Sequence, residues 1–339
     1  MPGSASHMKA WVCRAFRDPF ELVLEDIPVP VPGPGQVQIK VAAAGLNFGE
    51  TLVLKGAYQK TPPLPYIPVS EMSGVVSACG EGATRFQPGD PVSVFSFALE
   101  GGGLGQYAVM PEACVFAKPT AISLVQAAAF PFNYWTAFNG LEQRGNLRAA
   151  ETLVVHGATG GIGIAAVAIG KLLGAQVIAT GSDDARLARV RALGADHVIN
   201  LRTENLRDRV HALTGGRGAD VFLDPVGGEV FDLSTRCIAP GGRILVVGFT
   251  SGVWAQARTN ILLVKMVSVI GVEARLAIET TNGRGLADYL RLLDLISAGH
   301  VVPHVGNTYG FAEVLQGYDD IIARRHVGKS VVIVDPSLC

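Results

Sequence analysis

The sequence predicts a two-domain α/β protein, with a compact β-barrel-like domain followed by a doubly wound parallel sheet. Three observations lead to this fold class. The chain has 339 residues and is 49% hydrophobic, which is enough for two cores. Its first third alternates short β-type runs with turns. From about Ser123 onward strands alternate with helices, as in a parallel sheet that is covered on both faces.

The first third contains strong turn signals between its apolar runs. Pro32-Gly33-Pro34-Gly35 and Pro88-Gly89-Asp90 combine proline and glycine, which favour tight turns. The predicted strands of this region cover residues 9–14, 22–27, 36–44, 73–78, 91–94 and 106–110.

The remaining two thirds begin with an alanine-rich helix over residues 123–130, for which Ser123 is the predicted N-cap. A closing strand over 327–334 is expected to return to the first domain. The other predicted strands cover residues 152–156, 176–180, 197–200, 220–224, 243–247 and 267–272. The other predicted helices cover residues 162–173, 184–193, 204–213 and 287–298.

Composition argues against several classes of partner. The formal net charge is −1, and charged residues make up 17%, so no basic excess favours nucleic acid or a membrane surface. No apolar run is long enough to cross a bilayer. Residues 1–7 resemble an expression scar before Met8, and no signal peptide follows, so a cytoplasmic location is expected. The five cysteines lie far apart, which favours separate reduced thiols.

A glycine-rich loop follows the strand over residues 152–156. Its sequence is Gly157-Ala158-Thr159-Gly160-Gly161-Ile162-Gly163, and a helix follows directly. Glycines allow the backbone to approach a pyrophosphate, and the helix start offers unpaired N–H groups. The alternative is a plain turn, but the strand, loop, helix and second strand match a Rossmann dinucleotide site. The predicted cofactor-binding residues of this loop are Ala158, Thr159, Gly160, Gly161 and Ile162.

The end of the second strand predicts which nicotinamide cofactor binds. Gly181 and Ser182 leave room for a 2′-phosphate, where NAD-specific folds place an acidic residue. Arg186 lies within one helical turn and could neutralise that phosphate, so we expect NADPH rather than NADH. In the alternative interpretation Ser182 or Asp183 only caps the next helix, and Arg186 belongs to a solvated face.

Several motifs together resemble a known family. They are residues 45–50 (GLNFGE), 68–71 (PVSE), 158–163 (ATGGIG) and 224–228 (DPVGG). The chain resembles the zinc-free quinone oxidoreductases, the zeta-crystallin-like family of the medium-chain dehydrogenase/reductase superfamily. The resemblance implies a GroES-like catalytic domain over residues 8–130 and 274–339 and a Rossmann NADPH-binding domain over 131–273. It also implies an active site between these domains and a homodimer.

The same resemblance predicts that no zinc is bound. Zinc-dependent relatives carry a cysteine at the position of Asn47 and a histidine at that of Ser70, and neither replacement is a usual zinc ligand. Residues 97–107 contain no cysteine, so the structural zinc lobe is also expected to be missing. Glu71 would then serve a structural hydrogen bond or salt link. Val69 stands where a glycine is usual, and should alter the local turn or narrow the cleft.

Individual site residues follow from the resemblance. Asn47 matches an asparagine near the nicotinamide ribose and substrate, or else is a turn amide. Tyr58 matches a tyrosine beside the nicotinamide, or else covers the barrel. Thr136 matches a cofactor-contacting threonine, or else bonds its own helix backbone. The remaining implied cofactor contacts are the carboxamide-binding loops at Phe249 and at Gly271 and Val272, and a phosphate partner at Arg324.

Two further interpretations concern charged and titratable residues. Arg324, Arg325 and Lys329 could instead form a solvated face. His156 lies at a buried strand end and is interpreted as a satisfied core residue.

The expected function is hydride transfer from C4 of NADPH to a quinone or to the β-carbon of an α,β-unsaturated carbonyl. Asn47 and Tyr58 are the predicted catalytic residues, and the expected partner is a small molecule. One alternative is a non-catalytic NADPH-binding protein with a regulatory or RNA-contacting role. Another is a zinc alcohol dehydrogenase.

Overall fold

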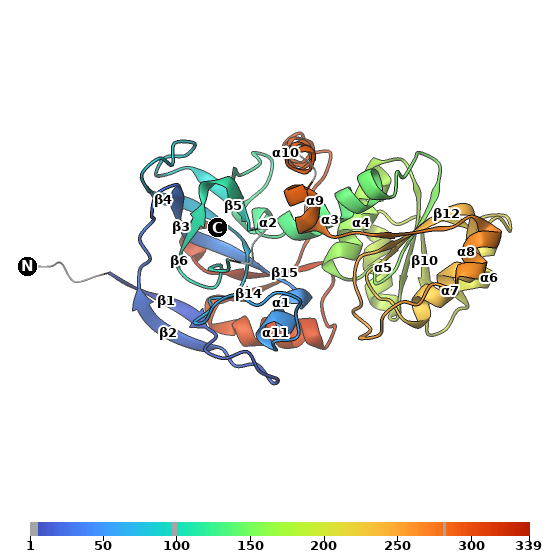
Figure 1. The fold of residues 1–339 in the computed structure, drawn as a ribbon, viewed down its shortest axis with the longest axis horizontal. Coiled ribbons are helices and arrows are strands. Elements are labelled where there is room, and N and C mark those ends of the chain that lie inside the picture. The colour runs from blue at the N-terminus through green and yellow to red at the C-terminus, as the bar shows by residue number, and fades with distance from the viewer. Residues whose placement is uncertain (1–5, 97–99, 281–282) are drawn as a thin grey trace, which may run out of the picture. The chain divides into compact units, whose positions relative to one another are not determined.

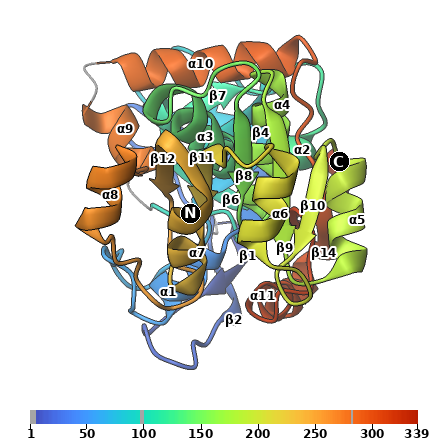
Figure 2. The same ribbon diagram turned by 90° about the vertical axis from the view of Figure 1, so that its right-hand side faces the viewer.

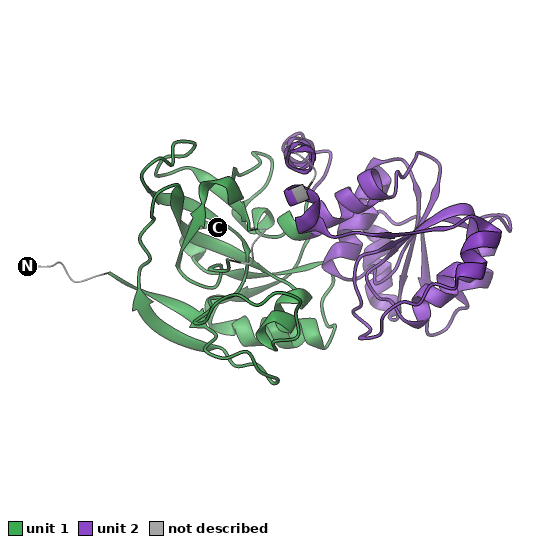
Figure 3. Cartoon of the chain, viewed as in Figure 1, with its two compact units in different colours: residues 1–132, 303–339 green, residues 133–302 purple. Residues whose placement is uncertain are grey.

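The computed structural model describes residues 6–96, 100–280 and 283–339 (Figure 1). The predicted scar lies outside the described residues up to residue 5, and His7 already belongs to a strand. Residues 97–99 of the cysteine-free stretch also lie outside. The chain divides into two compact units: unit 1 combines Met1–Phe132 with Pro303–Cys339, and unit 2 is Asn133–Val302 (Figure 3).

Unit 1 is built mainly from strands. These are β1 (His7–Val12), β2 (Val23–Pro28), β3 (Gln36–Leu46), β4 (Glu71–Cys79), β5 (Pro91–Phe95), β6 (Tyr107–Pro111), β7 (Val115–Ala117), β14 (Val305–Gly310) and β15 (Lys329–Ile333). A seven-stranded sheet has the order β14-β15-β3-β4-β5-β7, with β6 paired to β3, and β1 pairs with β2. Because Ser330 of β15 lies opposite Leu46 of β3, the predicted return of the last strand to the first domain is confirmed.

Short helices complete unit 1. They are α1 (Phe48–Leu54), α2 (Leu124–Ala127), α11 (Val314–Ile322) and the 3₁₀ turns η1 (Glu112–Cys114), η3 (Phe311–Glu313) and η4 (Pro336–Leu338). Ser123 caps α2 as predicted, in a capping box with Gln126. The inward residues of the strands form one apolar core, which includes Ile39, Met72 and Val94.

Unit 2 contains the predicted parallel sheet. Its strands are β8 (Thr152–Val155), β9 (Gln176–Gly181), β10 (His197–Asn200), β11 (Ala219–Asp224), β12 (Ile238–Val246) and β13 (Ser268–Gly271). They lie in the order β10-β9-β8-β11-β12-β13 and every neighbouring pair is parallel, as the side-by-side strands of Figure 2 illustrate. In chain order this is 3-2-1-4-5-6, the doubly wound arrangement that reverses between β8 and β11. The predicted α/β fold class is therefore confirmed.

Helices connect and flank these strands. They are α4 (Gly161–Leu172), α5 (Asp184–Ala192), α6 (Leu206–Leu213), α7 (Glu229–Cys237), α8 (Thr259–Lys265), α9 (Ala274–Thr280) and α10 (Arg284–Ser297), with α3 (Pro131–Phe138) and the π-helix η2 (Asn139–Arg144) before β8. None of the helices in the described part of the chain is both long and apolar enough to span a membrane.

The end of unit 2 differs from the sequence-based division, which assigned residues 274–302 to the first domain. Trp135 explains why these residues pack with unit 2 instead. Its indole N–H donates to the carbonyl of Ala274 at 2.7 Å, and its ring meets Tyr289 of α10 edge-on at 5.8 Å. Large buried aromatic rings such as these contribute strongly to packing.

Candidate active site

The candidate residues of unit 2 gather at the carboxyl edge of its parallel sheet. The glycine loop follows β8, Ser182 follows β9, and Phe249 lies three residues after β12. Gly271 ends β13 and Val272 follows it. In open parallel sheets ligands bind at this edge, beside the point where the strand order reverses, which here lies between β8 and β11.

The glycine loop leaves the amino end of α4 open. Gly160 is the N-cap of this helix and provides no side-chain cap, so the first N–H groups of α4 keep their donor capacity. Gly163 must be glycine, because an added Cβ would lie 2.5 Å from both Ala158 Cα and the Gly157 carbonyl oxygen. The Ala158 N–H donates to the Thr180 carbonyl at 3.0 Å and ties the loop to β9. This cradle has the donors that a diphosphate requires.

His156 directly precedes that loop and fixes its first residue through buried hydrogen bonds. It is fully buried, and its ring nitrogens lie 2.8 Å from Thr180 Oγ1 and 2.8 Å from Ser234 Oγ. The Ser234 hydroxyl donates its hydrogen bond to the Val230 carbonyl. His156 Nε2 therefore donates to Ser234 Oγ, and Nδ1 accepts from the Thr180 hydroxyl. The interpretation of His156 as a satisfied core residue is confirmed. Burial lowers the pKa of His156 to about 4, although the nearby Asp224 opposes the shift.

At the end of β9, Asp183 takes two roles. It caps α5 by accepting the Arg186 N–H at 2.9 Å, and its Oδ1 lies 3.5 Å from Arg186 Nε. The backbone hydrogen bond from Arg186 and the guanidinium charge lower the pKa of this partly exposed carboxyl. The capping alternative for Asp183 is thus confirmed, and Arg186 has an ion-pair partner rather than a purely solvated position. Ser182 is exposed beside them.

Other predicted cofactor residues lie on flanking segments of unit 2. Thr136 is buried on α3, one helical turn after Asn133. A Cβ on Gly161 would collide with the Asn133 side-chain amide, so this asparagine packs directly on the glycine loop. Phe249 packs against Gly227, where an added Cβ would lie 2.8 Å from its ring. Sequence reasoning missed Asn133, whose only signal was its spacing from Thr136.

In unit 1, Asn47 belongs to a buried polar cluster. It is the N-cap residue of α1, and its Nδ2 donates to Glu71 Oε1 at 2.5 Å. Lys329 Nζ donates to Asn47 Oδ1 at 2.7 Å and forms an ion pair with Glu71 Oε1. Glu71 Oε2 accepts the Phe132 N–H at 2.9 Å. The predicted salt link of Glu71 is confirmed.

The solvated-face interpretation of Lys329 is wrong. Its side chain and that of Glu71 are each only 2% exposed. Burial lowers the pKa of Lys329, and the Glu71 carboxylate opposes that shift. The available signal was the position of this lysine two residues before the apolar run of residues 331–334, in a strand expected to return to the sheet. An interior strand, with neighbours on both sides, has no solvated edge. Arg324, in contrast, is exposed after the end of α11.

A second buried acid lies nearby. Glu50 Oε1 accepts from the Tyr66 hydroxyl at 2.6 Å and from the Val69 N–H at 3.1 Å. Burial raises the pKa of Glu50, against the opposing hydrogen bonds, and burial also raises the pKa of Tyr66. Tyr58 is half-buried against the core of unit 1, and a Cβ on Gly49 would lie 3.8 Å from its ring. The ring of Tyr58 therefore lies against the first turn of α1, the helix for which Asn47 is the N-cap residue.

The resemblance raises the question of two bound groups, a catalytic zinc ion and a dinucleotide, and the residues of this chain fit them differently. At the position of the zinc-ligand cysteine stands the Asn47 amide, which is already bonded to the ammonium of Lys329. A zinc ion does not fit at this position, because the positively charged ammonium of Lys329 already contacts the Asn47 amide oxygen and an amide is not a usual zinc ligand. In residues 6–96, 100–280 and 283–339, no group of three or more His, Cys, Asp or Glu side chains could hold a metal. The loop of residues 157–163, whose glycines admit a close backbone approach, fits a dinucleotide diphosphate.

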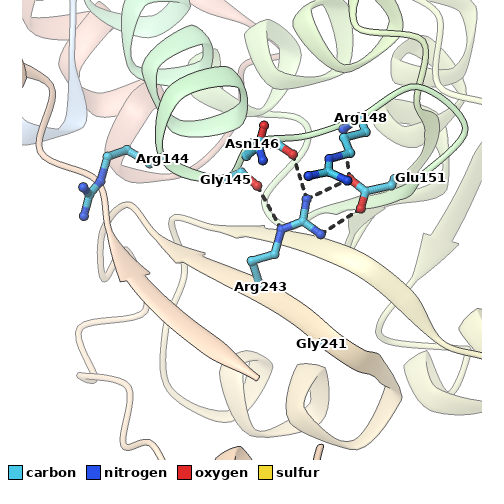
Figure 4. A pocket seen from close by; sticks show the side chains of 7 residues that line it. All are labelled: Arg144, Gly145, Asn146, Arg148, Glu151, Gly241 and Arg243. Carbon is cyan, nitrogen blue, oxygen red and sulfur yellow. Dashed lines mark hydrogen bonds and ion pairs between the residues drawn. The ribbon is translucent and has the colours of Figure 1, made fainter. Parts of the chain in front are cut away.

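A separate polar pocket of about 400 Å³ lies at the opposite edge of the unit 2 sheet (Figure 4). Glu151, directly before β8, forms a two-armed ion pair with Arg243, at 2.8 and 2.7 Å. Arg243 also donates to the carbonyls of Gly145 and Asn146. Its guanidinium is thus occupied by structural contacts that join η2 to the sheet, and the pocket is distinct from the candidate active site.

Comparison with known proteins identifies the family. Residues 33–120 match the alcohol dehydrogenase GroES-like domain, and residues 161–295 match the zinc-binding dehydrogenase domain. The chain therefore belongs to the medium-chain dehydrogenase/reductase superfamily and to its quinone oxidoreductase-like members. It is an oxidoreductase of that superfamily, a class that uses a nicotinamide cofactor.

Three relatives illustrate the match. The chain is 33% identical over 300 residues to a quinone oxidoreductase-like protein 2 homolog of Nematostella vectensis, covering 86% of this chain and 79% of the relative. The quinone oxidoreductase of Pseudomonas syringae pv. tomato DC3000 superposes with a TM-score of 0.86 at 29% identity, over 97% and 100% of the two chains. An NAD-dependent alcohol dehydrogenase superposes with a TM-score of 0.88 at 30% identity, also over 97% and 100%.

Proposed function

We propose that the protein reduces a quinone or an α,β-unsaturated carbonyl with NADPH and without zinc. The observation that carries this proposal is the amino end of α4, where no side chain caps the first N–H groups of the helix. This helix end lies beside the point where the strand order of the sheet reverses. The quinone oxidoreductase relatives support the choice of acceptor.

The bound cofactor would supply a hydride from its C4 atom. The acceptor then takes up one proton from solvent, so that an enone becomes a saturated carbonyl and a quinone becomes a hydroquinone. Negative charge develops on the acceptor oxygen, and a fixed hydrogen-bond donor stabilises that charge. Asn47 and Tyr58, which lie together at the start of α1, are the proposed donors. If Tyr58 is the main donor, Tyr58→Phe lowers kcat about 100-fold, whereas unchanged turnover removes it from this role.

For the remaining cofactor contacts we propose the residues along the carboxyl edge of unit 2. Main-chain groups at Phe249, Gly271 and Val272 would hold the carboxamide, and Thr136 would contact the cofactor from α3. Arg324 of unit 1 remains a proposed partner for a phosphate.

NADPH is the proposed cofactor because Arg186 can exchange its moderate 3.5 Å contact with Asp183 for a 2′-phosphate. Titration calorimetry with both reduced cofactors tests this choice. NADPH is expected to bind at least tenfold more tightly than NADH, and Arg186→Gln should remove that preference. Arg189→Gln, which removes a charge at the other end of α5, is the matched control. Tighter binding of NADH by the unaltered protein would contradict the proposal.

The activity itself is tested by following the absorbance of the reduced nicotinamide with a panel of quinones, enones and saturated alcohols. Oxidation of NADPH by a quinone or an enone is expected. Tight cofactor binding without turnover of any acceptor would instead favour a non-catalytic NADPH-binding protein.

We also propose a homodimer. Strand β13 is the edge of the unit 2 sheet, and among the strands of the described residues it pairs with β12 alone. The adjacent α8 contains no buried residue and exposes Leu263 and Val264, by 78% and 82%. An exposed edge strand beside a large apolar surface suits pairing with the same edge of a second copy around a twofold axis.

A further inference from the structure

We propose that Lys329 and Glu71 are positioning residues that fix the Asn47 amide in one orientation and direct its remaining N–H toward the reacting molecule. This inference rests on the proposed function, in which Asn47 is a hydrogen-bond donor at the reaction site. It goes further by assigning a task in the reaction to the buried ion pair of Lys329 and Glu71.

The three side chains come from neighbouring strands of one sheet. Strand β3 lies between β15 and β4, and Ser330 of β15 pairs with Leu46 of β3. Lys329 is therefore level with Asn47, one residue beyond that pair. Glu71 begins β4 on the other side of β3. The ion pair thus crosses over β3 immediately before the chain turns into α1.

The crossing is possible because residue 45 has no side chain. A Cβ on Gly45 would lie 2.7 Å from Lys329 Cε and 3.2 Å from Glu71 Cδ, in the path between the two charged groups. It would also collide with the carbonyl oxygen of Ala128. The side chains of Lys329 and Glu71 therefore occupy the space that a side chain at residue 45 would fill.

The contacts permit only one orientation of the Asn47 amide. The ammonium of Lys329 can only donate, and it contacts Oδ1 at 2.7 Å. The carboxylate of Glu71 can only accept, and it contacts Nδ2 at 2.5 Å. A flipped amide would set donor against donor and acceptor against acceptor. These two contacts use one of the two amide hydrogens, and the other has a fixed direction.

Stability alone does not account for these charges. Exchanging a buried ion pair for apolar or neutral side chains of similar volume is often neutral or stabilising, so such a pair is weak evidence of a stabilising role. What the pair does supply is orientation, and positive charge at Oδ1 polarises the amide so that its free N–H becomes a stronger donor. A donor held in this way needs no rearrangement as charge develops on the acceptor.

The decisive variant is the double substitution Lys329→Met with Glu71→Gln. It removes both charges together, and the glutamine carbonyl can still accept the Phe132 N–H that Glu71 now accepts. The double variant should therefore fold, whereas Lys329→Met alone would leave a buried unpaired carboxylate. Lys40→Met, which removes the partly exposed ion pair with Asp335 in the same unit, is the matched control.

The first measurement needs neither cofactor nor turnover. In cofactor-free protein with ¹⁵N-labelled asparagine, the Asn47 side-chain amide protons are assigned through their loss in Asn47→Asp. In the double variant their exchange with solvent should be at least tenfold faster than in the unaltered protein or in Lys40→Met. Equal exchange rates in all three proteins would overturn the positioning role, whether or not the protein reduces quinones.

The second measurement is the rate of hydride transfer in a single turnover with NADPH and an acceptor. The double variant should lose about tenfold or more in this rate and change its NADPH affinity by less than about twofold. Asn47→Ala should slow the unaltered protein strongly and the double variant much less. A double variant with a normal rate per folded molecule would overturn the inference. Absence of activity in the unaltered protein would instead refute the proposed function, and the exchange measurement would still decide the orientation.

Discussion

Val69 has a left-handed backbone conformation, with φ of 74°. A β-branched side chain is a genuine outlier there, because its Cβ substituents crowd the following carbonyl. The residue is nevertheless completely buried, its N–H donates to Glu50, and its carbonyl accepts from Gly103. The expectation that valine at this position alters the local turn agrees with a strained residue that its surroundings hold in place.

At this residue glycine should be better than alanine. Both Val69→Gly and Val69→Ala remove the two buried γ-methyl groups, and glycine removes the Cβ as well, and with it the left-handed strain. Val69→Gly should therefore be more stable than Val69→Ala by about 1 kcal/mol in urea unfolding. Val92, equally buried in β5, is the control. There the order should be reversed, because glycine weakens an ordinary strand. The same order at both positions would contradict the strain.

His156 should make stability depend on pH. Its pKa is about 4 in the folded protein, below the ordinary value of 6.5, so the folded state prefers the neutral ring. This contribution is complete above about pH 6.5 and is lost as the pH falls toward 4, by roughly 3 kcal/mol in total. Urea unfolding between pH 7 and 4 should show this loss, and His156→Gln should lack it. Parallel pH profiles for the two proteins would be evidence against the buried neutral histidine.

Single residues also mark how far the sequence could be interpreted. The burial of His156 was predictable from its position at the end of an apolar strand, where a polar residue needs a partner. The hydrogen bond or salt link of Glu71 was an expectation from the family resemblance. The partner of Glu71 was not predictable, since Lys329 is far away along the chain and meets Glu71 only through the pairing of β15 with β3. Strand register between distant segments is not encoded in local pattern.

Among the elements, the loop that leads into α4 depends most strictly on its glycines. Gly163→Ala would place a methyl group against Ala158 and the Gly157 carbonyl, and would push the loop out of its present path. We expect at least a tenfold loss of NADPH affinity together with a lower unfolding midpoint, measured by calorimetry and thermal unfolding.

Gly215→Ala is the control for this loop substitution. Gly215 has a positive φ, of 60°, and an added Cβ there would meet no atom within 4 Å. Only a modest loss of stability and unchanged cofactor affinity are expected in this control. If Gly163→Ala bound NADPH normally, the loop would not be the diphosphate site.

Elements with a clear apolar period were predictable, whatever their length, and those without one were not. The strands over 152–156, 176–180 and 197–200 and the helix over 184–193 agree with β8, β9, β10 and α5 to within about one residue. The helix observed in place of the one predicted over 123–130 is shorter. It ends at Ala127, and a separate helix, α3, begins at Pro131, a residue that favours the first position of a helix. Sequence pattern also missed α8, since its exposed apolar side chains give no amphipathic signal.

For the whole molecule, the exposed face of α8 and β13 predicts association. Light scattering coupled to size exclusion should give twice the chain mass at micromolar concentration. Val264→Lys should produce the monomer, because a charge would be buried at the centre of the interface. Val302→Lys is the control, since Val302 is 63% exposed elsewhere in unit 2. A monomeric unaltered protein would refute the dimer.

Unit 1 is assembled from both ends of the chain, and this has a consequence for biosynthesis. Every residue of unit 2 has been translated before β15 emerges from the ribosome. Domains tend to fold as units during synthesis, so the parallel sheet can form while the first 132 residues still lack β15, which pairs with β3. Asn47 and Glu71 remain without their cation until Lys329 is added. In the nascent chain we therefore expect nucleotide affinity to arise first, and the amide donor to be ordered only as translation finishes.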